Sequence, residues 1–306
     1  MTEENKTTLR QAENFVLIEG TLLENRLEEK EVNGKEAITG EMDIEVRENE
    51  VHTVSFFTYK YKNDGTENSI YKGLKTAMNE YKSVASNGRE EADRVRVTGG
   101  SIRLNEYYGQ DDQLRSIPQI QSNFITRIRA DEEFNPRAEF DVEIVVKSVS
   151  PEYKNDEETG RAIVKAYIVL YEGKVIPFDF VVDKDGADFV SENYEPGVTA
   201  RVYGDIINYK EVKEEEKPVA FGKPQKKVTT KTVREYLITG GSEPYDEDDP
   251  KAYDKEVIKK ALTEREVWLE QLKNKKNEDK KKDNKPKKGF DTKKDKKRIS
   301  DEELPF

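Results

Sequence analysis

The chain has 306 residues, of which 34% are hydrophobic and 38% are charged, so one large core spread over the whole length is excluded. It contains no cysteine and one histidine, which excludes disulfides, thiolate metal sites and thiol nucleophiles. The longest unbroken apolar run, residues 166–171, is far shorter than the roughly 20 residues that span a bilayer, and the first residues lack the pattern of a signal peptide. We therefore expect a soluble protein of a reducing compartment, the cytoplasm.

The formal net charge of -11 is unevenly distributed along the chain. Residues 246–306 hold 19 Lys and Arg against 17 Asp and Glu, so the negative charge lies in residues 1–245. Within that last part, residues 276–298 hold 12 basic and five acidic side chains. Blocks of like charge repel themselves and commonly form disordered interaction tails.

After a polar stretch, residues 1–12, that we expect to be flexible, the first half of the chain reads as three strands, a short helix and two strands. Residues 38–46 alternate between apolar and polar side chains, which is the period of a half-buried strand. The predicted strands are residues 15–20, 38–46, 51–61, 94–100 and 123–129, and the predicted helix is residues 69–83.

The same order recurs in the second half of the chain. The predicted strands there are residues 140–149, 162–171, 175–182, 199–206 and 233–239, with a helix at residues 186–194. Each copy carries a polar excursion between its fourth and fifth strands, at residues 105–122 and 210–231. Two copies of this pattern indicate a tandem repeat.

Three strands, a helix and two strands is the order of the OB-fold, a five-stranded Greek-key barrel. We therefore predict a mainly β protein with two tandem OB-like five-stranded barrels, at residues 13–135 and 136–245. Two other small β-barrels, or one large sandwich, are the alternatives.

The third segment has a different composition. Four acids, residues 246–249, precede Pro250, which favours a helix start there, and Tyr253, Val257, Ala261, Trp268 and Leu272 fall roughly on one helical face. We predict an acidic segment and helix over residues 246–275, followed by a disordered basic tether with an acidic tip over residues 276–306. The helix packs on the second barrel or forms only with a partner.

No pattern for catalysis stands out. The chain lacks a phosphate-binding Gly-rich loop and a nucleophile elbow, and His52 sits in a predicted strand among apolar residues, where a structural role is favoured. Residues 183–186 resemble a fragment of a calcium loop but lack the other ligands, so a turn is favoured. We predict no enzyme, no catalytic residue, no cofactor and no metal site.

The 15 tyrosines and 12 phenylalanines of this polar chain are more informative. Aromatic side chains interleaved with cations suit single-stranded nucleic acid, because bases stack on the rings while lysines neutralise phosphates. The alternative is that these rings are strand formers or core residues. The candidate DNA-binding residues are Phe57, Tyr59, Lys60, Tyr61 and Lys62 on the third strand, Tyr107 and Tyr108 in the first excursion, Lys165, Tyr167 and Tyr171 in the second copy, and Tyr209, Lys210, Lys213, Phe221, Lys223, Lys226 and Lys227 in or beside the second excursion.

One feature opposes binding by the first barrel. The predicted outer face of its second strand carries Glu41, Asp43 and Glu45, which would repel phosphate. The first barrel therefore binds through other strands, or the second barrel with its lysine-rich excursion does more of the work.

The chain ends in Asp301, Glu302, Glu303, Leu304, Pro305 and Phe306. This ending resembles the acidic tip of bacterial and phage single-stranded-DNA-binding proteins, which close with several acids, an apolar residue and Pro-Phe. The resemblance implies a docking peptide for genome-maintenance proteins. It covers six residues only: the tether is lysine-rich rather than Gly/Gln/Pro-rich, and the stacking residues come from alternation alone.

The sequence therefore predicts a phage-type or mobile-element single-stranded-DNA-binding protein that keeps strands open in replication, recombination or repair. Its partners would be single-stranded DNA and, through the tip, replication or recombination proteins, with no membrane. The charge pattern also suggests that the tip competes with DNA for the basic segments. The alternative is a non-catalytic interaction scaffold built on two β-barrels. A metal-dependent nuclease or polymerase accessory enzyme would need carboxylates clustered at a barrel mouth.

Overall fold

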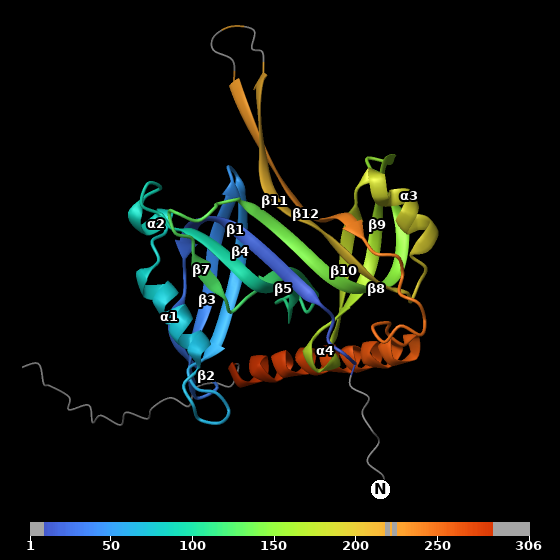
Figure 1. Ribbon diagram of the computed structural model, residues 1–306, viewed down its shortest axis with the longest axis horizontal. Coiled ribbons are helices and arrows are strands. Elements are labelled where there is room, and N and C mark those ends of the chain that lie inside the picture. The colour runs from blue at the N-terminus through green and yellow to red at the C-terminus, as the bar shows by residue number, and fades with distance from the viewer. Residues whose placement is uncertain (1–8, 218–220, 222–224, 284–306) are drawn as a thin grey trace, which may run out of the picture.

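The computed structural model of the chain consists of two β-barrels side by side, a two-stranded arm that rises from the second barrel, and a long helix that runs beneath both (Figure 1). It describes residues 9–217, 221 and 225–283, and for residues 211–217, 225–227 and 277–283 it describes the backbone only. Within these residues, no helix is both long and apolar enough to cross a membrane.

The first barrel is closed by five strands. Around the barrel they run β1–β3–β4–β6–β5 and back to β1, with β4 and β6 parallel and all other neighbours antiparallel. The strands are β1 (Asn14–Asn25), β3 (Lys35–Arg47), β4 (Glu50–Tyr59), β5 (Arg94–Tyr108) and β6 (Leu114–Gln121). The accessory elements are β2 (Glu28–Val32), α1 (Ser69–Glu80), α2 (Val84–Asn87) and β7 (Ile125–Arg127).

The second barrel repeats this arrangement strand for strand. Its order is β8–β9–β10–β12–β11 and back to β8, with β10 and β12 as the parallel pair. The strands are β8 (Arg137–Lys154), β9 (Glu157–Val169), β10 (Val175–Val182), β11 (Thr199–Lys217) and β12 (Gln225–Gly241). Between β9 and β10 lies the short η1 (Tyr171–Gly173), and α3 (Lys184–Asn193) follows β10.

Both barrels place a helix between their third and fourth strands and pair the third strand with the fifth in parallel, which is the OB arrangement. The predicted fold class, a mainly β chain with two tandem OB-like barrels and a C-terminal helix, is therefore confirmed.

The predicted alternation along the strands matches the cores. In β4, Val54 and Phe56 are buried while Phe57 and Tyr59 lie on the outer face. The second core is built around an aromatic cluster, in which the ring centroids of Phe140 and Phe180 are 5.4 Å apart. Because side chains alternate between faces along a strand, these cores fix which residues each barrel turns outward.

The two barrels are joined directly through their strands. β1 pairs antiparallel with β8 over six residues, from Asn14 opposite Val142 to Glu19 opposite Arg137. On another side, Tyr209 of β11 pairs with Glu50 of β4, and the Asn208 amide donates to the carbonyl of Val51 at 2.5 Å. The barrels therefore share backbone hydrogen bonds rather than a flexible connection.

Several predicted boundaries were wrong at the ends of the barrels. The fifth strand of the first barrel is β6 and not residues 123–129. Within residues 123–129 only β7 is a strand, and it pairs with β5. The two polar excursions are not loops but β-hairpins, formed by β5 with β6 and by β11 with β12. The second hairpin is the arm that projects from the body (Figure 1). The first hairpin extends past the core: only Ile120 is buried in β6, so this strand lacks the buried side chains that reveal alternation.

The C-terminal helix α4 (Lys255–Asp283) also differs from its prediction. It begins after Pro250, at Lys255, because the Asp254 carboxylate accepts hydrogen bonds from the backbone N–H groups of Glu256 and Val257, as an N-cap does. It continues to Asp283 instead of ending at Lys275. The rest of the predicted tether and the tip, residues 284–306, lie outside the described residues.

At the other terminus, residues 9–12 were predicted to be flexible but contact the second barrel. The Ala12 backbone N–H donates to the carbonyl of Val169 at 2.9 Å, and Arg10 pairs with the buried Glu143 at 2.6 Å. Residues 1–8 lie outside the described residues.

Candidate functional site

A cleft of about 810 Å³ lies between the barrels, and residues of both barrels line it, some from the outer faces and some from the cores. From the second and third strands of the first barrel come Glu41 of β3 and Thr53 and Ser55 of β4. From the corresponding strands of the second barrel come Ile163 of β9 and Asp179 of β10. The second and third strands of an OB barrel form its usual face for oligonucleotides and oligosaccharides. The two candidate faces therefore open onto one shared space, which we call the interbarrel cleft.

One row of aromatic side chains continues out of the interbarrel cleft along β4. Phe57 and Tyr59 share the outer face of the strand with Thr53 and Ser55, and both rings are partly exposed. The Phe57 and Tyr59 rings meet edge to face with centroids 4.9 Å apart, and the Lys35 ammonium lies 5.7 Å from the Tyr59 ring. This row combines rings with a cation, as the sequence predicted, although Lys35 was not predicted.

A second row continues from Ile163 along β9. Lys165 and Tyr167 share the outer face with Ile163, and the Lys147 ammonium lies 5.9 Å from the Tyr167 ring. Lys165 stands opposite Asp179 of β10 in the strand register. Each of the two rows therefore contains one partly exposed tyrosine with a lysine over its ring.

The carboxylates of the cleft are mostly paired with arginines. Arg26, from the connection between the first two strands, donates to both oxygens of Asp43 and lies 3.4 Å from Glu41. Arg161 bridges Glu235 and Glu152, with its Nη2 at 2.8 Å from Glu152. These pairs reduce the repulsion of phosphate that the acids of β3 suggested. Asp179 forms no ion pair among the described side chains.

The Arg161 bridge predicts a pH dependence of stability. The hydrogen bond from Arg161 is the largest cause that lowers the pKa of Glu152, to about 2, and burial opposes it. A carboxylate with a lowered folded pKa stabilises the fold above its unfolded pKa, near 4.5, and this contribution is lost as pH falls toward 2. Between pH 6 and pH 3.5 we expect a loss of about 1.4 kcal/mol from this group.

Urea unfolding of the wild-type chain and Glu152→Gln across this pH range tests the expectation. Because other carboxylates titrate in both proteins, the measured quantity is the difference in the free energy of unfolding between the two. This difference should shrink by about 1.4 kcal/mol as the pH falls. A difference that stays constant over the range would contradict the role of the Arg161 bridge.

His52 is 2% exposed, its Nε2 is 3.6 Å from Glu50 Oε1, and it is among the residues that line the interbarrel cleft. The neighbouring Arg47 also pairs with Glu50. The structural role that the sequence favoured for His52 stays a prediction. Among the residues whose side chains are described, no group of three or more His, Cys, Asp or Glu is arranged to hold a metal ion.

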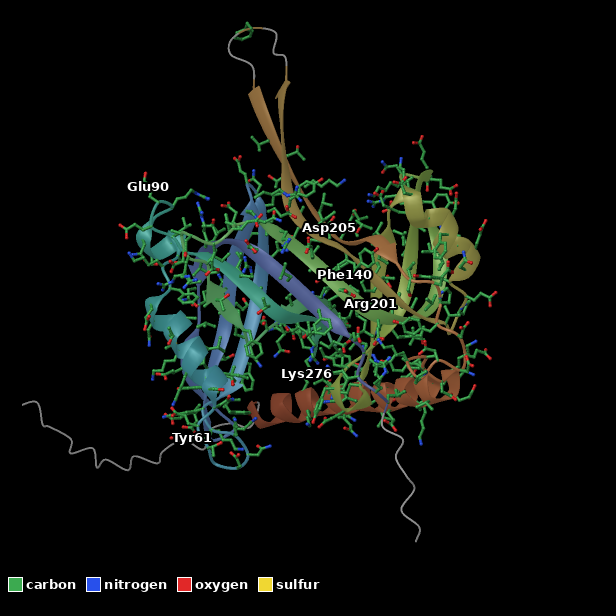
Figure 2. All side chains as sticks on the ribbon, in the orientation of Figure 1. Tyr61, Glu90, Phe140, Arg201, Asp205 and Lys276 are labelled. Carbon is green, nitrogen blue, oxygen red and sulfur yellow. The ribbon has the colours of Figure 1, made fainter. Side chains whose placement is uncertain are left out.

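None of the predicted binding residues with described side chains lines the interbarrel cleft itself, and several lie well away from it. Tyr61 follows the end of β4 at the lower end of the first barrel, on the opposite side of the molecule from the arm (Figures 1 and 2). Lys60 pairs with Glu36 at 2.7 Å and lies 5.5 Å from the Tyr61 ring, and Lys62 is exposed nearby. Tyr171, in η1, is 65% exposed. None of these side chains lines the interbarrel cleft.

The first hairpin is partly covered by α4. Tyr107 is 42% exposed, whereas Tyr108 lies under the Lys273 ammonium, 5.8 Å from its ring centroid. Lys276, labelled in Figure 2 at the far end of α4, donates to the carbonyl of Gly109 in the same hairpin. The helix therefore begins on the second barrel, where Ile258 is buried, and ends on the first.

The arm does not present a purely basic surface. The strand register sets Glu211 opposite Lys231, Glu215 opposite Lys227 and Glu216 opposite Lys226. Of the other predicted residues, Tyr209 and Lys210 lie where the arm leaves the body, and Phe221 is 91% exposed. Lys213, Lys226 and Lys227 are described by their backbone only, and Lys223 lies outside the described residues.

A second groove, of about 470 Å³, lies where β1, β8 and β11 form one continuous sheet. Phe15 and Tyr203 line it with exposures of 52% and 49%. Beside it, Arg201 donates to both oxygens of Asp141, and Figure 2 labels Arg201 and Asp205 on β11. The groove shares no lining residue with the interbarrel cleft.

Comparison with known proteins gives a family and a set of distant structures. A family model described as YorF matches residues 13–278. No curated protein sequence matches the chain. The wild-type single-stranded DNA binding protein from Thermus aquaticus is similar at a TM-score of 0.49 and 12% identity, over 78% of this chain and 95% of that one.

Two further structures show weaker or equal similarity. A deletion variant of the same Thermus aquaticus protein has a TM-score of 0.49 and 12% identity, over 79% of this chain and all of that one. A replication protein A heterotrimer bound to single-stranded DNA has a TM-score of 0.19 and 8% identity, over 77% of this chain and 51% of that one.

Proposed function

The chain belongs to the YorF family, and we propose that it is a non-enzymatic, cytoplasmic protein that binds single-stranded DNA in the interbarrel cleft. The observation that carries the proposal is that the second and third strands of both OB-like barrels line this one cleft. Because this face of the OB-fold is suited to oligonucleotides, one strand passing through the cleft would contact both barrels at once.

The chemistry of the outer faces supports the same function. Each barrel contributes a partly exposed tyrosine with a lysine near its ring, Tyr59 with Lys35 and Tyr167 with Lys147. Stacking on such rings accepts any base, since every base has a π-face. We therefore propose binding with little dependence on sequence, which would keep strands open for replication, recombination or repair.

We further propose that residues 301–306 recruit genome-maintenance proteins, as the tips of phage-type and bacterial single-stranded-DNA-binding proteins suggest. A terminal phenylalanine ring fits an apolar pocket, and its carboxylate can pair with a cation beside that pocket. The same acids would compete with DNA for the lysines of the chain when no partner is present.

A fluorescence anisotropy titration tests DNA binding. The probe is a labelled oligo-dT of about 30 nucleotides, near the upper end of what two OB barrels cover, compared with a matched duplex. We expect at least roughly tenfold tighter binding of the single strand, with an affinity that falls as salt rises because phosphates are neutralised.

The same titration is run on a chain that ends at Ser300. If the tip competes with DNA, this chain should bind the single strand more tightly at low salt, and unchanged binding would contradict the competition. Failure of both chains to bind at low salt would overturn the proposed function.

A further inference from the structure

Nearly all arginines with described side chains are paired with a carboxylate. Of 15 such arginines, 12 lie within ion-pairing distance of Asp or Glu. The remaining three are Arg94, Arg103 and Arg234. Arg94 is exposed and lies over the Phe134 ring at 4.7 Å, which gives it a partner of another kind.

Arg103 lies on the outer face of β5, on the first barrel. It is directly opposite Gln119 of β6, which lines the interbarrel cleft and donates to the Ser55 hydroxyl of β4 at 2.5 Å. Among the described residues its one polar contact is with a neutral group, since its Nε donates to the Ser101 hydroxyl at 3.2 Å. Burial lowers the pKa of the guanidinium. A partly buried cation with no counter-charge is unfavourable unless an anion completes its shell.

Arg234 lies on β12, on the second barrel, and lines the same cleft. It is exposed, and its Nε donates to the Asn208 amide oxygen at 3.2 Å. Asn208 is in turn held to the first barrel through the carbonyl of Val51. The Arg234 side chain is therefore positioned at the junction of the barrels by a neutral group, and its Nη groups stay available.

We propose that Arg103 and Arg234 are phosphate-binding residues for one DNA strand that crosses from the first barrel to the second through the interbarrel cleft, an inference that rests on the proposed function. A planar guanidinium presents two parallel N–H donors to phosphate oxygens, and it stays charged when partly desolvated. The neighbours of the two arginines, Gln119 opposite Arg103 and Asn208 beside Arg234, are uncharged, and neither arginine has a described carboxylate within ion-pairing distance.

The test is the salt dependence of binding to labelled oligo-dT in the full chain. For a single strand, each lost phosphate contact lowers the slope of log affinity against log salt by about 0.7. Arg103→Gln and Arg234→Gln should each lower it by about 0.7 and the double variant by about 1.4, with roughly tenfold weaker binding per substitution at low salt. Arg103→Lys keeps the charge and should keep the wild-type slope.

Arg94→Gln is the matched control, because Arg94 also lacks a carboxylate but is the first residue of β5, over the Phe134 ring and nine residues from Arg103. The salt slope of this variant should equal that of the wild type. Thermal unfolding confirms that each variant is folded. A wild-type chain that binds oligo-dT, together with a folded Arg103→Gln chain of unchanged slope, overturns this proposal while the proposed function stands. If the salt slope changes in only one of the two arginine variants, the proposal that one DNA strand crosses both barrels is overturned. A wild-type chain that does not bind overturns the proposed function itself.

Discussion

Replacing Arg265 with alanine should lower the free energy of unfolding by about 3–5 kcal/mol. Arg265 of α4 donates through both Nη groups to Glu106 of β5, with Nη1 at 2.8 Å from Oε2. The side chains are 12% and 4% exposed. Without the arginine, the Glu106 carboxylate would remain buried with no opposite charge, and that desolvation makes the loss large.

Urea unfolding followed by circular dichroism and by the fluorescence of Trp268 measures the effect. Trp268 is the only tryptophan and lies on α4, so its signal reports the helix, while circular dichroism reports the secondary structure of the whole chain. Lys259→Ala is the control, because its pair with Glu256 lies on the same helix with side chains 69% and 78% exposed. Such an exposed pair contributes under about 1 kcal/mol.

A double substitution separates the pair from its surroundings. If the cost comes from the unpaired buried charge, adding Glu106→Gln to Arg265→Ala should recover part of the lost stability, because a neutral amide is less costly to bury. If the losses in the free energy of unfolding from Arg265→Ala and from Glu106→Gln simply add in the double variant, a direct interaction between the two side chains is contradicted. A variant in which Trp268 fluorescence changes at lower urea than circular dichroism would show that α4 leaves the barrels first.

Much of the fold could be predicted from the sequence because the barrel cores impose a period of two. Residues 38–46 and 162–171 alternate, and the same strand and helix order appears twice. The prediction failed where strands leave the cores. In β6 only Ile120 is buried, and the register of the arm sets Glu opposite Lys at residues 211, 215 and 216, so neither shows an apolar alternation.

The contact face of α4 shows a second limit. The predicted apolar face included Trp268, which is 43% exposed, and omitted Ile258, which is buried. The face that meets the first barrel uses Arg265 and Lys276, whose partners are Glu106 and the carbonyl of Gly109. A search for apolar periodicity does not find a helix face held by charged side chains, because their partners are distant in sequence.

The candidate site was predictable in part for the same physical reason. Alternation with the buried Val54 and Phe56 correctly placed Phe57 and Tyr59 on the outer face of β4, but it gave no information on where along the barrel each outer residue falls. Tyr61 therefore lies beyond the strand end. No sequence signal marks Arg103, because what distinguishes it is the absence of a carboxylate among neighbours that only the folded barrel brings together.

Replacing Tyr59 and Tyr167 with alanine should weaken binding of oligo-dT by roughly 5- to 150-fold each, because a stacked base contributes about 1–3 kcal/mol. Both rings lie on the outer rows that lead from the interbarrel cleft, one on each barrel. The salt slope should stay at its wild-type value, since neither substitution removes a charge. Stacking and phosphate contacts are thus separated by two readouts of one titration.

The matched control is Tyr203→Ala, which removes a ring that is 49% exposed but lines the separate groove on β11. Its affinity should equal that of the wild type. Because the tyrosines of the two rows lie on different barrels and do not touch each other, their losses should add in the double variant when the oligonucleotide is long enough to cross the cleft. A short oligonucleotide that fills one barrel only can contact one of the two tyrosines at a time. On this oligonucleotide, the affinity loss of the double variant should be little more than the smaller of the two single-variant losses measured on the long oligonucleotide. If one DNA strand is shared by both barrels, the affinity losses should add on the long oligonucleotide and not on the short one. Unchanged binding by the folded double variant would show that the two rows do not contact DNA.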